Sequence, residues 1–132
     1  MSWRTTSSLV RLRLMLTIPC VVALACGCGT APRVAGDAVP VRLAIQAGKS
    51  AEVCFALAEG DRVDYAFDAT SAVDFNLHTH RGQQVVMPVE VTHTAAQSGK
   101  YVSLQAGDYC LTWKNAAGIP SHISGEWRRV PK

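Results

Sequence analysis

The feature that most constrains the fold is an alternation of apolar and polar side chains that recurs from Val41 to the end of the chain. Apolar residues occupy every second position in runs such as residues 53–57 and 73–77. Beyond Val41, no stretch places apolar residues at helical spacing. Because successive side chains of a strand point to opposite faces, this pattern predicts an all-β domain.

Glycine-containing turn clusters divide the alternating runs into eight short strands. We expect these strands at residues 41–45, 51–57, 62–69, 73–80, 84–91, 100–104, 108–114 and 121–128. Strands of this length and spacing, with no helices between them, predict a two-sheet antiparallel β-sandwich.

The alternation also assigns an inward face to five of these runs. Pro88 cannot donate to a strand ladder, so its strand is expected at an edge of a sheet or with a bulge at that point. The predicted core consists of Val53, Phe55, Leu57, Val63, Tyr65, Phe67, Val73, Phe75, Leu77, Val85, Met87, Val89, Tyr109, Leu111 and Trp113.

The first part of the chain has the order of a secretory signal peptide. Arg4, Arg11 and Arg13 precede an apolar run, which is followed by small residues. The run of about a dozen residues is shorter than the roughly 20 needed to span a bilayer. Residues 1–27 are therefore expected to be a leader, residues 28–40 a flexible tether of small residues with prolines, and residues 41–132 the domain.

Charge excludes one class of partner. The whole chain carries a formal charge of +3, with 13 basic and 10 acidic residues. Three of the basic residues belong to the leader, so the domain without it is neutral. A neutral domain lacks the Lys/Arg excess that neutralises phosphates, and we expect no nucleic-acid binding.

The end of the leader, Ala-Leu-Ala-Cys-Gly-Cys at residues 23–28, resembles the lipobox of bacterial lipoproteins. The resemblance implies a lipid on Cys26 or Cys28 that anchors the domain to a membrane. Neither cysteine is followed by Asp, which resembles the outer-membrane sorting pattern and implies a protein facing the periplasm. Simple cleavage after Ala25 or Gly27, leaving a soluble periplasmic protein, is the alternative.

The remaining cysteines form a pair inside the domain. Cys20 lies in the leader and Cys26 or Cys28 in the lipobox, which leaves Cys54 and Cys110. Disulfides persist in exported domains. A bond between these cysteines would close a loop of about 57 residues and contribute about 4 kcal/mol to the stability of the fold. Both cysteines are out of phase with the large apolar residues of their strands, so we expect a lateral bond between neighbouring strands of one sheet. A redox or metal-binding thiol pair normally has Cys-x-x-Cys spacing, which is absent.

The segments Ala-Glu-Val-Cys-Phe at residues 51–55, Glu-Gly-Asp-Arg-Val at 59–63, Val-Asp-Phe-Asn-Leu at 73–77 and Gly-Asp-Tyr-Cys-Leu-Thr-Trp-Lys-Asn at 107–115 occur in a characteristic order. Together they resemble the GOLD (Golgi dynamics) β-sandwich, whose luminal cargo-receptor members carry a disulfide between early and late cysteines. The resemblance covers most of the domain and implies a sandwich that binds a protein or a lipid. It does not extend to the trafficking function of those receptors.

A pair of histidines is the candidate metal site. His78 and His80 are two residues apart on a predicted strand, so they share a face about 7 Å apart. Further ligands must come from other strands, and His93, His122 and Glu90 are the candidates. Imidazole ligands suit copper or zinc. We expect a plain, solvated polar face with no cofactor, and a copper or zinc site is the alternative.

No catalytic motif accompanies these residues. The sequence contains no Gly-x-Ser-x-Gly elbow, no His-Glu-x-x-His and no phosphate-binding glycine loop. We therefore expect a non-enzymatic binding or adaptor module with an envelope protein or a lipid as its partner. A periplasmic copper- or zinc-binding protein that uses the histidines is the alternative.

Overall fold

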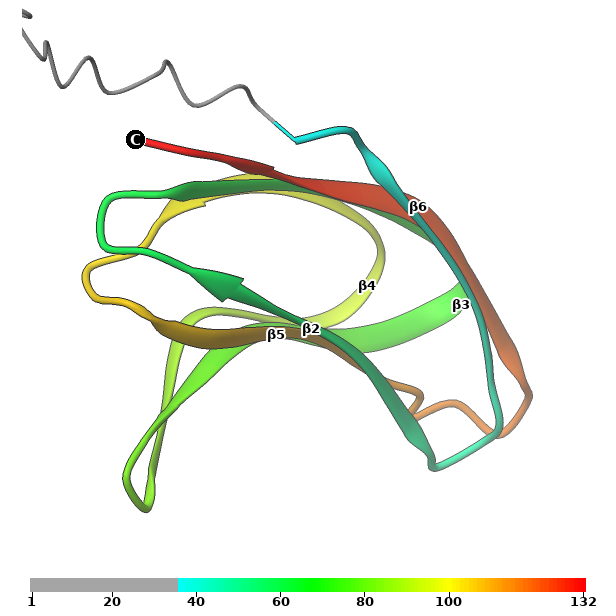
Figure 1. Ribbon diagram of the computed structural model, residues 1–132. Coiled ribbons are helices and arrows are strands. Elements are labelled where there is room, and N and C mark those ends of the chain that lie inside the picture. Colours follow the sequence, from blue (N-terminus) through cyan, green and yellow to red (C-terminus); the bar gives the residue numbers. More distant parts are fainter. Residues whose placement is uncertain (1–35) are drawn as a thin grey trace, which may run out of the picture. The chain divides into compact units, whose positions relative to one another are not determined.

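The computed structural model describes residues 36–132, which form a single antiparallel sheet without helices. The strand order is β1-β6-β3-β5-β2, and β4 pairs with β3 outside this path. The prediction of an all-β domain is confirmed (Figure 1). The described residues include no helix that is long and apolar enough to cross a membrane. The strands are β1 (Val39–Ile45), β2 (Ser50–Leu57), β3 (Arg62–Arg81), β4 (Gln84–Val102), β5 (Gly107–Lys114) and β6 (Ser121–Val130).

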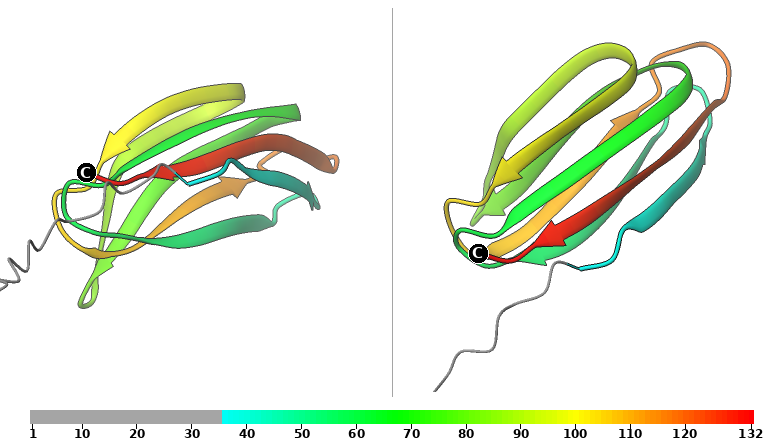
Figure 2. Two further views of the ribbon diagram at one scale, coloured as in Figure 1. Left: turned by 45° about the horizontal axis from the view of Figure 1, so that its top comes forward. Right: turned by 90° about the horizontal axis from the view of Figure 1, so that it is seen from above.

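The sheet is curled because the long strand β3 changes partner midway. Residues 62–69 of β3 pair with β6, whereas residues 74–79 pair with β5. The ladder between β3 and β4 shifts register between Asp68 and Val73, where the strand bends. Figures 1 and 2 show β3 and β4 running together as one long hairpin through this bend. The two halves of β3 consequently line different sides of one core.

The structure has six strands where the sequence predicts eight. The expected breaks at residues 70–72 and 92–99 lie inside β3 and β4. Bulges replace these breaks, and His93 adopts a positive φ of 54° at one of them. A bulge bends a strand without ending its pairing, and alternation along the sequence does not distinguish it from a short loop. The first strand begins at Val39, two residues before the predicted start of the domain.

The core is a cluster of aromatic and aliphatic side chains inside the curl. Phe67 lies with its ring centroid 4.9 Å from that of Phe75 and 5.6 Å from that of Trp113, edge-on in the second case. Phe55 of β2 stacks on Trp127 of β6 at 4.2 Å, so strands from opposite sides of β3 in the sheet order meet across the curl. The predicted core residues that are buried are Leu57, Val63, Tyr65, Phe67, Val73, Phe75, Leu77, Tyr109, Leu111 and Trp113.

The core prediction is wrong for two residues. Val85 and Met87 are 48% and 47% exposed. The register between β3 and β4 shifts between Leu77 and Thr79, so β4 carries an extra residue there. A bulge moves the following side chains to the other face, which breaks the alternation assumed for this run. The expectation that the strand containing Pro88 is bulged is confirmed.

A buried carboxylate holds the C-terminal end of the chain against the turn before β3. Asp61 is fully buried and accepts hydrogen bonds from the backbone N–H groups of Ala58 and Lys132, at 2.8 and 3.2 Å, and from Nε of Arg129 at 2.7 Å. Burial by itself raises the pKa of Asp61, but these hydrogen bonds and the Arg129 charge outweigh it and hold the pKa below its ordinary value. The carboxylate therefore stabilises the fold in its ionised form.

Candidate functional site

The two cysteines of the domain are joined on adjacent strands. Cys54 of β2 lies directly opposite Cys110 of β5, with Cα atoms 4.1 Å apart and sulfurs 2.04 Å apart. The bond is lateral within one sheet, as the sequence predicts. Because the core residues of both strands occupy the alternate positions, the disulfide lies on the outer face of the curl. Cys54 is exposed, and Cys110 is 8% exposed.

Three strands place polar side chains in two rows on this outer face. In one row Thr112 of β5 pairs with Glu52 of β2 and with Asn76 of β3. In the next row Cys110 pairs with Cys54 and with His78. We call this surface the disulfide face, and it consists of Glu52, Cys54, Asn76, His78, Cys110 and Thr112.

Hydrogen bonds connect the disulfide face and orient its histidine. Nδ1 of His78 lies 2.9 Å from Oδ1 of Asn76 and 3.3 Å from Oγ1 of Thr112. Because Oδ1 of an amide only accepts, Nδ1 carries the proton and the lone pair of the neutral ring is on Nε2. Oγ1 of Thr112 donates in turn to Oε2 of Glu52 at 3.4 Å. This network leaves Nε2 of His78 available to a ligand.

The same geometry argues against nucleophilic catalysis at this face. In a nucleophile–histidine–orienter triad, the nucleophile and the orienting residue contact opposite nitrogens of the ring. Here Thr112 and Asn76 both approach Nδ1 of His78. Nδ1 of His78 carries the proton that it donates to Asn76, so it does not also accept the proton of Thr112. The three residues therefore do not form a triad.

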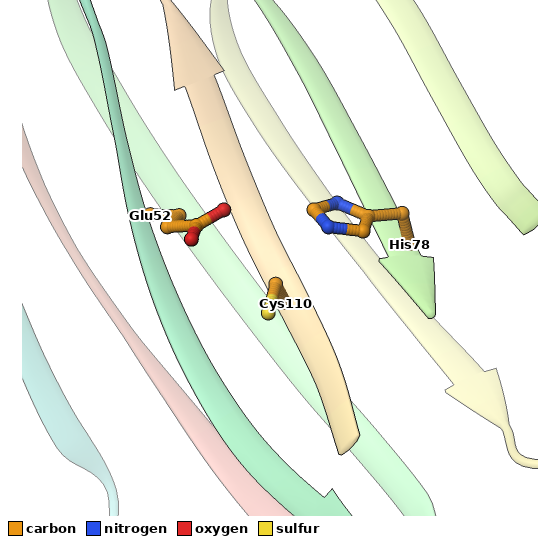
Figure 3. A group of neighbouring side chains, drawn as sticks. All are labelled: Glu52, His78 and Cys110. Atoms are coloured by element: carbon orange, nitrogen blue, oxygen red, sulfur yellow. The ribbon is translucent and has the colours of Figure 1, made fainter. Parts of the chain in front are cut away.

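Three side chains of the disulfide face form a potential metal-binding group. Ligand atoms of Glu52, His78 and Cys110 all lie within 4.8 Å of one another. Figure 3 shows the His78 ring directed toward the other two side chains. The sulfur of Cys110 is bonded to Cys54, so it is not a thiolate, and only the carboxylate and the imidazole can act as ordinary donors. Two donors fall short of the three or four protein ligands of zinc sites.

The structure brings together only part of the predicted histidine site. The rings of His78 and His80 are neighbours, with centroids 5.2 Å apart. His93 lies at a bulge of β4, where its backbone N–H donates to Asp74 at 3.0 Å. Neither His80 nor His93 belongs to the ligand group formed by the described residues. The candidate lipidation sites, Cys26 and Cys28, lie outside the described residues.

Sequence reasoning missed Glu52 and the part played by Cys110. Glu52 is two residues before Cys54, so it shares the outward phase of that strand. The alternation indicates that Glu52 points outward. Only the pairing of β5 with both β2 and β3 places Glu52 and His78 on the same surface.

A second surface feature is an open groove of about 280 Å³ on the outer side of β3, β4 and β6. Its charged lining contains both signs, with Asp64 and Glu126 opposed by Lys100 and Arg128. Nε of Arg62 donates to Asp64 at 2.6 Å, and this hydrogen bond is the main reason that the pKa of Asp64 lies below its ordinary value. The groove is therefore a mixed-charge surface near neutral pH.

No protein-family model matches the chain, and no curated protein matches it. Among solved structures, the chain is similar to a de novo designed double-stranded beta-helix determined by solution NMR. The two are 16% identical, with a TM-score of 0.40, and the match covers 70% of this chain and 99% of that chain. At this TM-score the likeness supports no argument about ancestry or function.

Proposed function

We propose that this protein is an exported, non-enzymatic binding or adaptor module of the cell envelope. A lipid on Cys26 or Cys28 would hold it to the outer membrane, facing the periplasm. The observation that carries the proposal is the disulfide between Cys54 and Cys110, with Cys54 exposed on the outer face of the sheet. Exposed disulfides of this kind suit an oxidising compartment, which agrees with the leader-like start of the sequence.

The proposal includes a two-layer arrangement of the GOLD type. The first half of β3 joins β6 and β1 in one layer, and the second half joins β5 and β2 in the other. The change of partner along β3 supports this reading. The position of the disulfide between an early and a late strand supports it as well.

The mixed-charge groove is the binding surface that we propose. Asp64, Lys100, Glu126 and Arg128 offer both acceptors and donors to a partner with charges of both signs. A polar segment of an envelope protein or a zwitterionic lipid headgroup has this chemistry. Complementary charge of this kind favours specificity more than affinity.

Location is tested by blocking lipoprotein processing with globomycin and measuring the intact mass of the mature protein. We expect an acylated N-terminus at Cys26 or Cys28 and accumulation of the unprocessed precursor in the treated cells. A mature chain that begins after Ala25 or Gly27 without a lipid would replace the anchored form with a soluble periplasmic one.

Binding is tested by photo-crosslinking in intact envelopes. A photoreactive residue in place of Glu126, in the groove, should give a discrete adduct, whereas the same residue in place of exposed Ala116 should not. Equal labelling from both positions, or no adduct from the groove, would contradict a binding role for this surface.

A second candidate function is transition-metal binding by the disulfide-bonded protein through His78 and His80. Two separate observations favour it: a carboxylate oxygen of Glu52 lies within 4.8 Å of a ring nitrogen of His78, and the ring of His80 neighbours that of His78. Isothermal titration with Cu(II) and Zn(II) tests it. Binding that is unchanged in the His78→Ala and His80→Ala variants would end this candidate.

A further inference from the structure

We infer that reduction of the Cys54–Cys110 disulfide converts the disulfide face into a zinc(II) site with two thiolates, the imidazole of His78 and the carboxylate of Glu52 as its ligands. This site shares His78 with the second candidate function. Unlike that function, it requires the reduced protein.

The positions of the donors support this site. Ligand atoms of Glu52, His78 and Cys110 already lie within 4.8 Å of one another. The sulfur of Cys54 is bonded to that of Cys110, so reduction releases a fourth donor at the same place. In tetrahedral zinc sites the ligand atoms lie about 2.0 to 2.3 Å from the metal, which sets neighbouring donors roughly 3 to 4 Å apart. The paired backbones hold β2, β5 and β3 in register, so the four donors start close to this spacing.

The supporting residues favour a zinc-binding tautomer of the histidine. Asn76 accepts from Nδ1 of His78 at 2.9 Å, which leaves the lone pair of the ring on Nε2. A histidine ligand of a metal commonly donates its other ring N–H to an oxygen in this way. Thr112 donates to Glu52 and restrains the carboxylate. The hydrogen bonds of Asn76 and Thr112 would thus orient the ligands His78 and Glu52 of the metal site.

The donor types select the metal. Two thiolates with one imidazole and one carboxylate form a borderline-soft tetrahedral set, which suits zinc(II). Calcium and magnesium prefer sites made only of oxygen ligands. The expected ion is therefore zinc(II), with cobalt(II) as its spectroscopic substitute.

In the cell, the reduction step uses a dithiol reductant. A thiolate of the reductant attacks the sulfur of Cys54, which is an exposed residue, the bond to Cys110 breaks, and Cys110 leaves as a thiolate next to His78. The second thiol of the reductant then displaces Cys54, so the reductant ends as a disulfide and the protein gains two electrons and two protons. Binding of zinc(II) releases these two protons to solvent.

The test is a titration with cobalt(II) of the full-length protein in which Cys20, Cys26 and Cys28 are replaced by serine, before and after reduction by a non-chelating phosphine. We expect thiolate-to-cobalt charge-transfer absorption only in the reduced protein, and loss of this absorption when zinc(II) is added. Zinc affinity should be at least about 100-fold higher in the reduced protein than in the disulfide-bonded one, because two thiolate donors are gained.

Matched variants identify the ligands. Glu52→Gln and His78→Ala should each weaken zinc binding by the reduced protein by about 10-fold or more, whereas His80→Ala should leave it unchanged. No charge-transfer absorption, or equal zinc affinity in the two redox states, would overturn the inference. Tight zinc binding by the disulfide-bonded protein that requires His78 and His80 would support the second candidate function and overturn the inference.

The reduced chain is checked by circular dichroism in each titration. If reduction unfolds the domain, zinc(II) should restore the β-sheet signal, because binding to a site that exists only in the folded state stabilises that state. A reduced chain that stays unfolded in excess zinc(II) would also contradict the inference.

Discussion

The two halves of β3 are stabilised by different chemistry. Next to the first half, which pairs with β6, the buried Asp61 holds Arg129 and the backbone of Lys132. Next to the second half, which pairs with β5, a covalent bond joins β5 to β2. One strand thus connects a region stabilised by an ionised carboxylate to a region stabilised by a disulfide. Acid should therefore weaken the first region, and a reductant should weaken the second.

Removal of the disulfide is expected to have the largest effect. The double variant Cys54→Ser/Cys110→Ser should lower the free energy of unfolding by about 4 kcal/mol, because the unfolded chain regains the freedom of a long loop. Urea denaturation measures the loss, and reduced wild-type protein without metal should match the variant. Equal denaturation midpoints for the variant and the disulfide-bonded protein would show that the disulfide does not stabilise the second region.

Loss of the buried carboxylate should be the next largest effect. Asp61→Asn removes the negative charge to which Ala58, Arg129 and Lys132 donate hydrogen bonds and should cost about 3 kcal/mol at neutral pH. The folded-state pKa of Asp61 is depressed, so its contribution is present above the ordinary pKa of 3.8 and is lost as the pH falls through the folded value. Wild type and variant should therefore converge in acid. In urea denaturation across pH, exposed Asp68→Asn is the control, and a constant gap between wild type and Asp61→Asn would contradict this account.

The contact between β6 and β3 offers a smaller test of the first region. A Cβ on Gly125 would clash with the backbone oxygen of Ala66 and lie 2.7 Å from Cα of Phe67. Backbone atoms cannot move aside as side-chain ends do, so Gly125→Ala should cost about 2 kcal/mol. Gly118→Ala meets nothing within 4 Å and is the matched control in thermal denaturation. Equal melting temperatures for the two variants would contradict close packing at Gly125.

The smallest effect is expected on the disulfide face itself. Thr112→Val removes two long hydrogen bonds, to Glu52 and His78, from a partly exposed position. The free energy of unfolding should fall by less than about 1 kcal/mol. A larger loss in urea denaturation would show that the polar rows stabilise the fold, and would weaken the view that they are kept for binding.

The features that could be predicted from the sequence are those that depend on the alternation of apolar and polar side chains along a strand. Alternation correctly placed Phe67, Phe75 and Trp113 in the core, and the phase of Cys54 and Cys110 correctly indicated a lateral bond. These predictions hold because the face to which a side chain points in a strand depends only on its position along that strand.

Features that depend on pairing were not predictable in the same way. Bulges in β4 exposed Met87, and the position of a bulge is decided by the partner strand as well as by the sequence. The nearness of Glu52 to His78 requires β5 to lie between β2 and β3. The buried carboxylate of Asp61 accepts from Arg129, which is 68 residues away along the chain. In each case the controlling contact is long-range, and local alternation contains no information about it.

The bond between Cys54 and Cys110 is the claim on which both the export proposal and the reduction-dependent site depend. The most direct measurement is peptide mapping of protein taken from its native cells after rapid alkylation of free thiols. We expect a disulfide-linked pair of peptides containing Cys54 and Cys110 in most of the material, and alkylated Cys54 and Cys110 only in a minor, reduced fraction. Alkylation of both cysteines throughout the population would contradict it.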